Sequence, residues 1–341
     1  MKKTALFLKT LAFCLPILGM SGAPTAQTPK LSALQAGTIS QPTGRIAFIR
    51  EKAIWVMDAT GANQMKVVSA QNADGRMSWS PDGRRIAFTR SGSIDYAEPD
   101  GTGGGKHKLY DIFIAYIDSA QVGNTFFWRR LTDDLGSRDP DWSLDGNTII
   151  FTKDVNANAI NAQMPNYQLC VMNPEGGDFQ LLRKDWANMP EFLMSPSMNA
   201  KGEIAFVHFF NQRPQGLAVL PRERIMTPLD SIGKQSAKML TCLVPSWSPD
   251  GKWIAYVKND PAKPGIYIAT PDLAKSYLVY EPPAGVGLIT IASSFSPDSK
   301  WLTFSSSDGS IWISDITGSQ VKRLSGPGLD FAPAWSKQVK R

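Results

Sequence analysis

The sequence predicts an all-β protein: a six-bladed β-propeller with four-stranded antiparallel blades, whose first blade is closed by the C-terminal strand. Three observations predict this fold. Residues 78–90 read SWSPDGRRIAFTR, and near-copies begin at positions 141, 246 and 294, a kind of internal repeat that indicates a solenoid, a propeller or an array. Each copy is followed by further short segments of high β-propensity. The chain also begins with one half of a repeat and ends with the other half.

Each copy of the repeat predicts a β-hairpin. A segment ending in Trp-Ser leads into a Pro-Asp-Gly turn, in which proline fixes φ and glycine accepts a positive φ. The β-branched and aromatic run that follows suits a half-buried strand. Third strands are expected at 54–58, 112–118, 169–173, 266–269 and 311–315, and fourth strands at 130–132, 238–241 and 323–325. Four short antiparallel strands make a propeller blade; the repetition disfavours the alternative, a β-sandwich with fortuitous turns.

Six first strands can be counted along the chain. They contain Trp79, Trp142, Met198, Trp247, Phe295 and Trp335, the Met198 copy being the most divergent. Residues 44–50 match the second strand of the repeat with no first strand before them, whereas residues 332–336 match a first strand with nothing after it. The C-terminal strand is therefore expected to complete the first blade and to leave no open sheet edge there.

The repeat resembles the PD40 repeats of TolB-like six-bladed propellers, which are related to the propellers of prolyl oligopeptidases. The resemblance covers residues 44–336 and rests on the Trp-Ser-Pro-Asp-Gly type of turn. It implies envelope proteins as partners, which place a peptide or a small domain at the channel mouth. The chain departs from relatives that carry an α/β domain before the propeller or a hydrolase domain after it, because it has no room for either.

The first 26 residues are expected to be a secretory signal peptide. Lys2 and Lys3 precede a mostly apolar stretch that ends in small residues, and its apolar core at 10–20 is too short to span a bilayer. A lipoprotein signal at Cys14 and an uncleaved anchor are the alternatives. A periplasmic or secreted protein without a transmembrane span is expected.

Residues 27–43 are rich in Thr, Pro, Gln, Ala and Gly and are expected to form a flexible tether before a propeller at 44–341. Removal of the leader with its three lysines leaves 33 basic and 30 acidic residues, a net charge of +3. That charge is too small to predict nucleic-acid binding, which depends on dense neutralisation of phosphates. Exported proteins can hold disulfides, but Cys170 and Cys242 fall in different blades, so two buried thiols are expected instead of a bridge.

The two faces of the predicted disc differ in their loops. The first and third turns of each blade lie on one face, the turn face, where the Pro-Asp-Gly turns are short and repetitive. The second turns and the blade-to-blade links lie on the other, the loop-rich face, with long loops at 91–108, 154–166 and 259–264. Long irregular loops on a rigid scaffold usually carry binding residues, so the site is expected on the loop-rich face.

Alignment of the copies predicts a ring of basic side chains on that face. The residue that ends the second strand is Arg50, Arg90, Lys153, His208 and Lys258 in five blades, and Ser306 in the sixth. The basic ring would bind an acidic segment or a carboxylate at the channel mouth, which Arg138, Asp139, Glu191 and Asp330 would border. The alternative is that each base is a solvated strand-end charge that opposes aggregation, or pairs with a local acid such as Glu51 or Asp154.

Catalytic and metal-binding motifs are weak. The chain has two histidines, His107 and His208, so a three-histidine metal site is excluded, and a Ser-His-Asp triad would have to recruit one of them. Residues 101–106 read GTGGGK but lack the first glycine and the final Ser or Thr of a phosphate-binding loop, so a flexible loop tip is expected. Residues 154–158 alternate oxygen ligands without the EF-hand glycine and glutamate. No metal and no cofactor are expected.

The sequence thus predicts an exported, monomeric, non-catalytic propeller that binds an envelope protein or peptide on its loop-rich face. The first alternative is an enzyme or small-molecule binder whose site lies in the channel and uses carboxylates and basic residues in place of histidines. The second is a propeller that packs against a separate catalytic subunit. A fold does not determine a function, so the partner class rests on the family resemblance.

Overall fold

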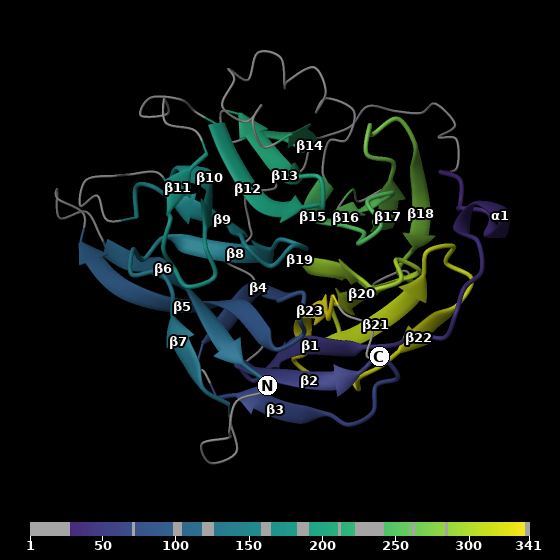
Figure 1. Ribbon diagram of the computed structural model, residues 1–341, viewed down its shortest axis with the longest axis horizontal. Coiled ribbons are helices and arrows are strands. Elements are labelled where there is room, and N and C mark those ends of the chain that lie inside the picture. The colour runs from purple at the N-terminus through teal and green to yellow at the C-terminus, as the bar shows by residue number, and fades with distance from the viewer. Residues whose placement is uncertain are drawn as a thin grey trace.

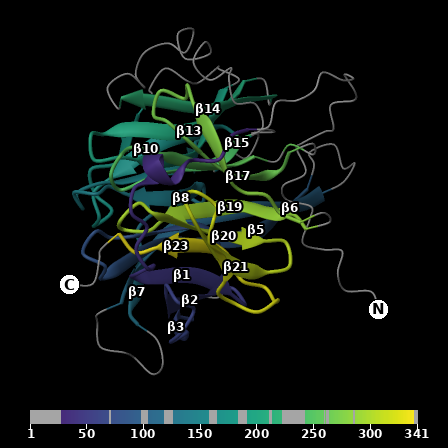
Figure 2. The ribbon, with the colours of Figure 1, turned by 90° about the vertical axis from the view of Figure 1, so that its right-hand side faces the viewer.

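The computed structural model arranges the chain as six small sheets around a central axis (Figure 1), and Figure 2 shows the same molecule turned by a quarter. It describes residues 28–69, 72–97, 104–117, 126–157, 165–182, 191–210, 213–221, 242–258, 260, 263–283 and 286–337. The expected all-β, six-bladed propeller is confirmed. The predicted signal peptide at 1–26 lies outside the described residues.

Each sheet is one blade, and its strands follow one another from the axis outward. Blade 1 contains β23 (Phe331–Trp335), β1 (Arg45–Arg50), β2 (Ala53–Asp58) and β3 (Met65–Val68). Blade 2 contains β4 (Ala73–Trp79), β5 (Arg85–Ala97), β6 (Gly104–Tyr116) and β7 (Trp128–Arg130). Blade 3 contains β8 (Ser137–Trp142), β9 (Ile149–Asp154), β10 (Tyr167–Met172) and β11 (Gln180–Leu181).

The second half of the disc follows the same order. Blade 4 contains β12 (Glu191–Met198), β13 (Glu203–Phe210) and β14 (Arg213–Pro221). Blade 5 contains β15 (Cys242–Trp247), β16 (Ile254–Lys258), β17 (Gly265–Ala269) and β18 (Ser276–Tyr280). Blade 6 contains β19 (Leu288–Phe295), β20 (Trp301–Ser306), β21 (Ser310–Asp315) and β22 (Val321–Arg323). Five blades are four-stranded as expected; blade 4 shows three strands, because its expected fourth strand at 238–241 lies outside the described residues.

The C-terminal strand closes the ring, as the two half-repeats predict. β23 pairs antiparallel with β1, with Ile46 opposite Trp335 and Ile49 opposite Phe331. The indole of Trp335 is 1% exposed, and its Nε1 donates to the carbonyl oxygen of Thr43 over 2.8 Å. Blade 1 is therefore built from both ends of the propeller, and its innermost strand is the last strand of the ring to be synthesised.

The repeated turn is held by one hydroxyl and one carboxylate. Ser80 Oγ accepts from the backbone N–H of Arg85 over 2.9 Å and donates to Asp82 Oδ1, which in turn accepts from the N–H of Arg84 over 3.0 Å. Gly83 completes the turn at φ +66°, in the left-handed region that favours glycine. The same serine–aspartate pairs recur as Ser143 with Asp145, Ser248 with Asp250 and Ser296 with Asp298.

The hydrophobic core is a set of layers between neighbouring blades. In one layer Ile150 and Val171 of blade 3 pack with Phe206 and Ala218 of blade 4. In such an arrangement each blade buries its faces only against its two neighbours. Cys170 lies in the layer between blades 2 and 3, with Trp142 and Phe151.

Both cysteines that were expected to be buried thiols are buried and free. Burial raises the pKa of the Cys170 thiol and of the Cys242 thiol to about 12. Each thiol is therefore protonated at neutral pH and behaves as a small apolar side chain.

Residues 28–43 differ from the expected flexible tether, because they pack as a strap across blades 5 and 6. Leu31 and Ala36 are buried in the layer between these blades. A short helix, α1 (Ala33–Ala36), is capped by Ser32. The strap is tied down by hydrogen bonds from Trp301 Nε1 to the Ser40 carbonyl and from the Leu278 N–H to the Pro29 carbonyl. The composition of this segment predicted flexibility, whereas burial of Leu31 and Ala36 between the two blades holds it in place.

The loop expected at 91–108 is for the most part an extension of a hairpin. β5 and β6 stay in register from Arg85 opposite Tyr116 to Ala97 opposite Gly104. The glycine-rich residues 101–103 lie outside the described part of the chain. Within that part, no helix has the length and apolar character needed to cross a membrane.

Candidate functional site

The six inner strands line a central channel, and each is interrupted by a β-bulge. Breaks in the pairing register occur in all six, at β4, β8, β12, β15, β19 and β23. Residues in the left-handed region mark five of them: Gly75, Asp139, Ser195, Val244 and Ala332. Bulges bend a strand and re-aim its side chains. In two blades the preceding blade satisfies the bulge amide, since Thr89 Oγ1 accepts from Asp139 and Thr152 Oγ1 from Ser195.

After the bulge, one position of the repeat ties the inner strand to the next inner strand in four blades. Ser78 Oγ accepts from the N–H of Trp142 over 2.9 Å, and Ser197 Oγ accepts from that of Trp247 over 3.1 Å. Ser294 Oγ does the same for Trp335 over 3.0 Å. In blade 3 the position is an aspartate: Asp141 Oδ2 accepts from the N–H of Met198 over 3.1 Å. A belt of polar side chains therefore surrounds the channel, and one member carries a negative charge.

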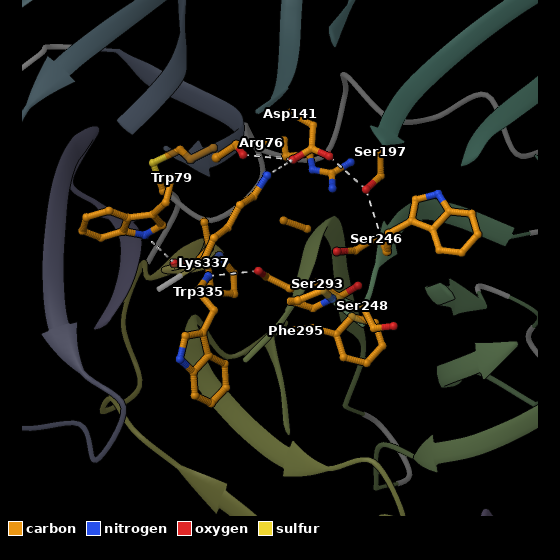
Figure 3. A pocket seen from close by; sticks show the side chains of 18 of the residues that line it. Arg76, Trp79, Asp141, Ser197, Ser246, Ser248, Ser293, Phe295, Trp335 and Lys337 are labelled. Carbon is orange, nitrogen blue, oxygen red and sulfur yellow. Dashed lines mark hydrogen bonds and ion pairs between the residues drawn. The ribbon is translucent and has the colours of Figure 1, made fainter. Parts of the chain in front are cut away.

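Asp141 is the centre of the channel's hydrogen-bond network. It is 5% exposed, and it accepts from the hydroxyls of Ser78 over 2.9 Å and Ser197 over 3.0 Å. Lys337 Nζ lies 3.2 Å from Asp141 Oδ1 and also donates to the carbonyl oxygen of Trp142. Figure 3 shows these side chains meeting in the channel. Each oxygen of the Asp141 carboxylate therefore accepts at least two hydrogen bonds.

A second cation, Arg76, spans the channel from β4. It is 5% exposed, and its Nη1 donates to the carbonyls of Pro196 and Pro245 over 2.9 and 3.0 Å. Burial would raise the pKa of Asp141, but the charges of Lys337 and Arg76, together with the hydrogen bonds from Met198 and Ser78, outweigh burial and lower that pKa. Burial lowers the pKa of Lys337, and Asp141 opposes that shift. The carboxylate is therefore ionised at neutral pH.

Little space remains in the channel. A cavity of about 40 Å³ lies among these residues, toward the turn face, because its wall includes Leu144, Ser248 and Pro249 of the turns. That volume has room for a few waters at most. Ser293 also lines the cavity; it is 2% exposed, and its hydroxyl has no hydrogen-bond partner among the described residues.

On the loop-rich face, the predicted residues Arg50 and Asp330 form one bidentate ion pair. Arg50 Nε and Nη2 each lie 2.7 Å from a carboxylate oxygen of Asp330. The hydrogen bond to Asp330 raises the pKa of Arg50. The guanidinium also lies over the rings of Phe48 and Trp55, at 5.0 and 4.9 Å. The Arg50 side chain remains 26% exposed.

Three other bases of the predicted ring lie against aromatic rings or acids: Arg90, Lys153 and Lys258. Arg90 lies over Phe113 and Trp128, and burial together with nearby Arg130 lowers its pKa. Lys153 pairs with Asp134, and Lys258 lies 3.2 Å from Asp260. His208 is 2% exposed, so it is an interior residue of β13.

Blade 6 also has a cation near this face, but it comes from the fourth strand and not from the end of the second strand. Ser306 has no charge, but Arg323 of β22 lies over Trp312 at 5.9 Å and 3.4 Å from Asp308. Blades 1, 2, 3, 5 and 6 therefore each hold a cation against an aromatic side chain, with Phe179 and Tyr267 serving Lys153 and Lys258. Such pairs recur near this face although only some bases align in sequence.

The residues predicted to border the mouth lie in three places on the inner strands and the links before them. Arg138 and Asp139 are neighbours on β8 with 3.1 Å between Nε and Oδ2, and Arg138 also lies over Tyr110 at 4.6 Å. Burial would lower the pKa of Arg138, but Asp139, Tyr110 and other acidic neighbours together outweigh burial and raise that pKa. Glu191 begins β12. Asp330 precedes β23 and belongs to the pair with Arg50.

Gly309 positions Asp330, and a substitution there is expected to be costly. The N–H of Asp330 donates to the Gly309 carbonyl over 3.1 Å. Gly309 has φ +72°, and an added Cβ would lie 1.7 Å from the carbonyl oxygen of Gly328. We expect Gly309→Ala to lower the free energy of unfolding by about 2–4 kcal/mol in urea denaturation. Gly251→Ala is the control, because its φ is +69° and no described atom would lie within 4 Å of its Cβ, and about 1 kcal/mol is expected. Equal losses would contradict the steric explanation.

The channel residues were not predicted from the sequence. Asp141 could have been noticed, since it replaces the serine found at the same repeat position in Ser78, Ser197, Ser246 and Ser294. Arg76 and Lys337 carry no such signal, because neither belongs to the repeated pattern. Within the described residues, no group of three or more His, Cys, Asp or Glu side chains could hold a metal ion.

Comparisons with known proteins show the fold. No family model and no curated protein matches the sequence. TolB from Acinetobacter baumannii matches with a TM-score of 0.60 and 17% identity over 86% of this chain and 66% of that chain. A putative TolB from Agrobacterium tumefaciens matches with a TM-score of 0.50 and 13% identity over 84% and 90% of the two chains. An oligogalacturonate lyase from Vibrio parahaemolyticus matches with a TM-score of 0.45 and 10% identity over 82% and 72%.

The two TolB matches show a TolB-like propeller architecture. At such identities the likeness concerns the fold alone. The chain spans about two thirds, 66%, of the length of the Acinetobacter baumannii protein.

Proposed function

We propose that this protein is a non-catalytic binding module of the cell envelope, exported by its leader, which docks a protein or peptide partner on the loop-rich face. The fold shared with the TolB structures supports this by analogy, since propellers are rigid scaffolds that present loops. Arg50 and Arg138, with Asp139, Glu191 and Asp330, would border the docking surface at the channel mouth.

The observation that carries the proposal is the set of cation–aromatic pairs on five blades. A guanidinium or ammonium held over an aromatic ring is oriented without being fully desolvated. Arg50 and Lys258 keep 26% of their side-chain surface exposed, and Lys153 keeps 19%. Carboxylates of the partner would bind these cations, either in place of their present partners, such as Asp330 and Asp260, or beside them. This favours an acidic peptide segment over an apolar one.

The contents of the channel disfavour the main alternative, a small-molecule or catalytic site inside it. Arg76 and Lys337 extend into the channel at its turn-face end, and the cavity beside them measures about 40 Å³. A drug-sized or sugar-sized ligand needs several hundred Å³. A channel ligand would therefore require the C-terminal residues to move.

The test is affinity capture from envelope extract with two charge-matched baits. In the ring variant, Arg50, Arg90, Lys153 and Lys258 are all changed to Gln. In the control variant, Gln replaces four exposed bases of the turn face, Arg84, Lys201, Lys252 and Lys275. We expect a discrete acidic partner to bind the wild type and the control, to be lost at high salt, and to be captured at least tenfold less by the ring variant.

Thermal unfolding of each bait shows whether it is folded. A folded ring variant that captures the partner as well as the wild type does would rule out docking through the ring. If the wild-type protein captures no discrete partner at all, the binding-module proposal itself fails.

A further inference from the structure

The last described residue of the chain reaches into the channel. Lys337 follows β23 of blade 1, yet its ammonium contacts two residues of blade 3: the carboxylate of Asp141, 3.2 Å away, and the carbonyl oxygen of Trp142. Its side chain is 16% exposed. The Lys337 side chain therefore reaches from blade 1 to blade 3 inside the channel, where Figure 3 shows it beside Asp141.

The site that receives this ammonium is held in place by groups other than Lys337. The Ser78 and Ser197 hydroxyls and the Met198 N–H orient the Asp141 carboxylate. The two carbonyl bonds of Arg76 fix that guanidinium on its own. The hydroxyl of Ser293, buried in the cavity wall and unpartnered within the described part of the chain, offers one further polar contact.

We propose that the turn-face end of the channel is a binding site for a primary alkylammonium group, which the chain fills with its own Lys337. An ammonium carries three donors on a narrow aliphatic stem. A carboxylate and a backbone carbonyl are suitable acceptors, and the indoles of Trp79 and Trp335 line the same pocket. A lysine side chain of a partner, or a free alkylamine, is the class of ligand that would compete with Lys337.

This site is independent of the loop-rich face. Asp141 and Trp142 end β8 near the turn face, whereas Arg50 and Asp330 lie where β1 ends and β23 is about to begin. The ammonium site is thus distinct from the surface proposed for partner docking, and either proposal can fail without the other. In this proposal the Lys337 side chain fills the ammonium site until a competing amine displaces it.

The experiment is chemical rescue of Lys337→Ala, followed by thermal unfolding of the full chain without its leader. We expect the substitution to lower Tm by on the order of 5 °C, because Asp141 loses one cationic partner. Millimolar n-butylammonium chloride should then restore at least half of that loss. The wild type, whose site is filled, should not respond. Lys252→Ala should not respond either, since Lys252 is an exposed lysine 3.7 Å from Asp250.

Tetramethylammonium chloride at the same concentration distinguishes a site from an ionic-strength effect, since it has the charge but no N–H donor. Equal responses of Lys337→Ala to both salts, or none to n-butylammonium, would overturn the proposal. The double variant with Asp141→Asn should lose the rescue. If it does not fold, the decision rests on tryptophan fluorescence of folded Lys337→Ala: saturable change with n-butylammonium alone supports the site, and its absence contradicts it.

Discussion

Replacing Asp141 by alanine is expected to lower the free energy of unfolding by about 3–5 kcal/mol, the cost of breaking a buried charge network on one side. The substitution leaves Arg76 and Lys337 without their anionic partner. It also removes the acceptor for the hydroxyls of Ser78 and Ser197 and for the Met198 N–H. Urea denaturation at neutral pH measures the loss. Asp141→Asn, which keeps the shape and one carbonyl oxygen, should fall between alanine and the wild type.

The same residue predicts a pH dependence. The pKa of Asp141 is lower in the folded protein than its ordinary value of 3.8. Its contribution to stability is therefore complete above the unfolded pKa, and it is lost as the pH falls below about 4 toward the folded pKa. The difference between the wild type and Asp141→Ala should be constant from pH 5 to 7 and shrink below pH 4. A Ser294→Ala variant, which alters the belt without a charge, should show a pH-independent difference.

Two outcomes would contradict this account of the channel. A folded Asp141→Ala protein within about 1 kcal/mol of the wild type would show that the two cations find solvent or other partners. A difference between the variants that grows as the pH falls would have the wrong sign for a carboxylate with a depressed pKa.

Ending the chain before Phe331 is expected to abolish cooperative folding of the propeller. The truncation removes β23, the innermost strand of blade 1 and its pairing with β1. It also removes three buried side chains. Ala332 and Ala334 pack in one core layer with Ile49 and Met77, and Trp335 packs in another with Ile46 and Trp301. Blade 1 would then present an open edge and an uncovered apolar face.

Differential scanning calorimetry of the truncated chain checks this expectation. The control ends the chain after Lys337, which keeps β23 and the ammonium in the channel, and it should unfold with the wild-type transition. A synthetic peptide of residues 329–337 added to the truncated chain should restore part of the transition, as the missing strand of a split blade. A cooperative transition of the truncated chain near the wild-type Tm would refute the requirement for ring closure.

The architecture could be read from the sequence because its repeated turn is encoded locally and occurs four times. The hydrogen bonds of the Ser80–Asp82–Gly83 turn lie within six consecutive residues, and each copy of the turn predicts the same hairpin. Closure by the C-terminal strand followed from counting strands at the two ends. The sequence placed Arg50 at a strand end and Asp330 just before a first strand, but it did not predict that the two side chains pair with each other.

Tertiary structure alone decided what occupies the channel and how the strap lies. Lys337 is 196 residues from Asp141, and Arg76 is 169 residues from Pro245; neither pair has a spacing that sequence patterns report. His208 aligns with half-buried bases of other blades, yet its own side chain is 2% exposed. The physical reason is the same in each case. Strand periodicity and turn chemistry act over a few residues, so they can be read from the sequence. The burial and the partners of a charged side chain in the channel depend on distant strands that ring closure brings together.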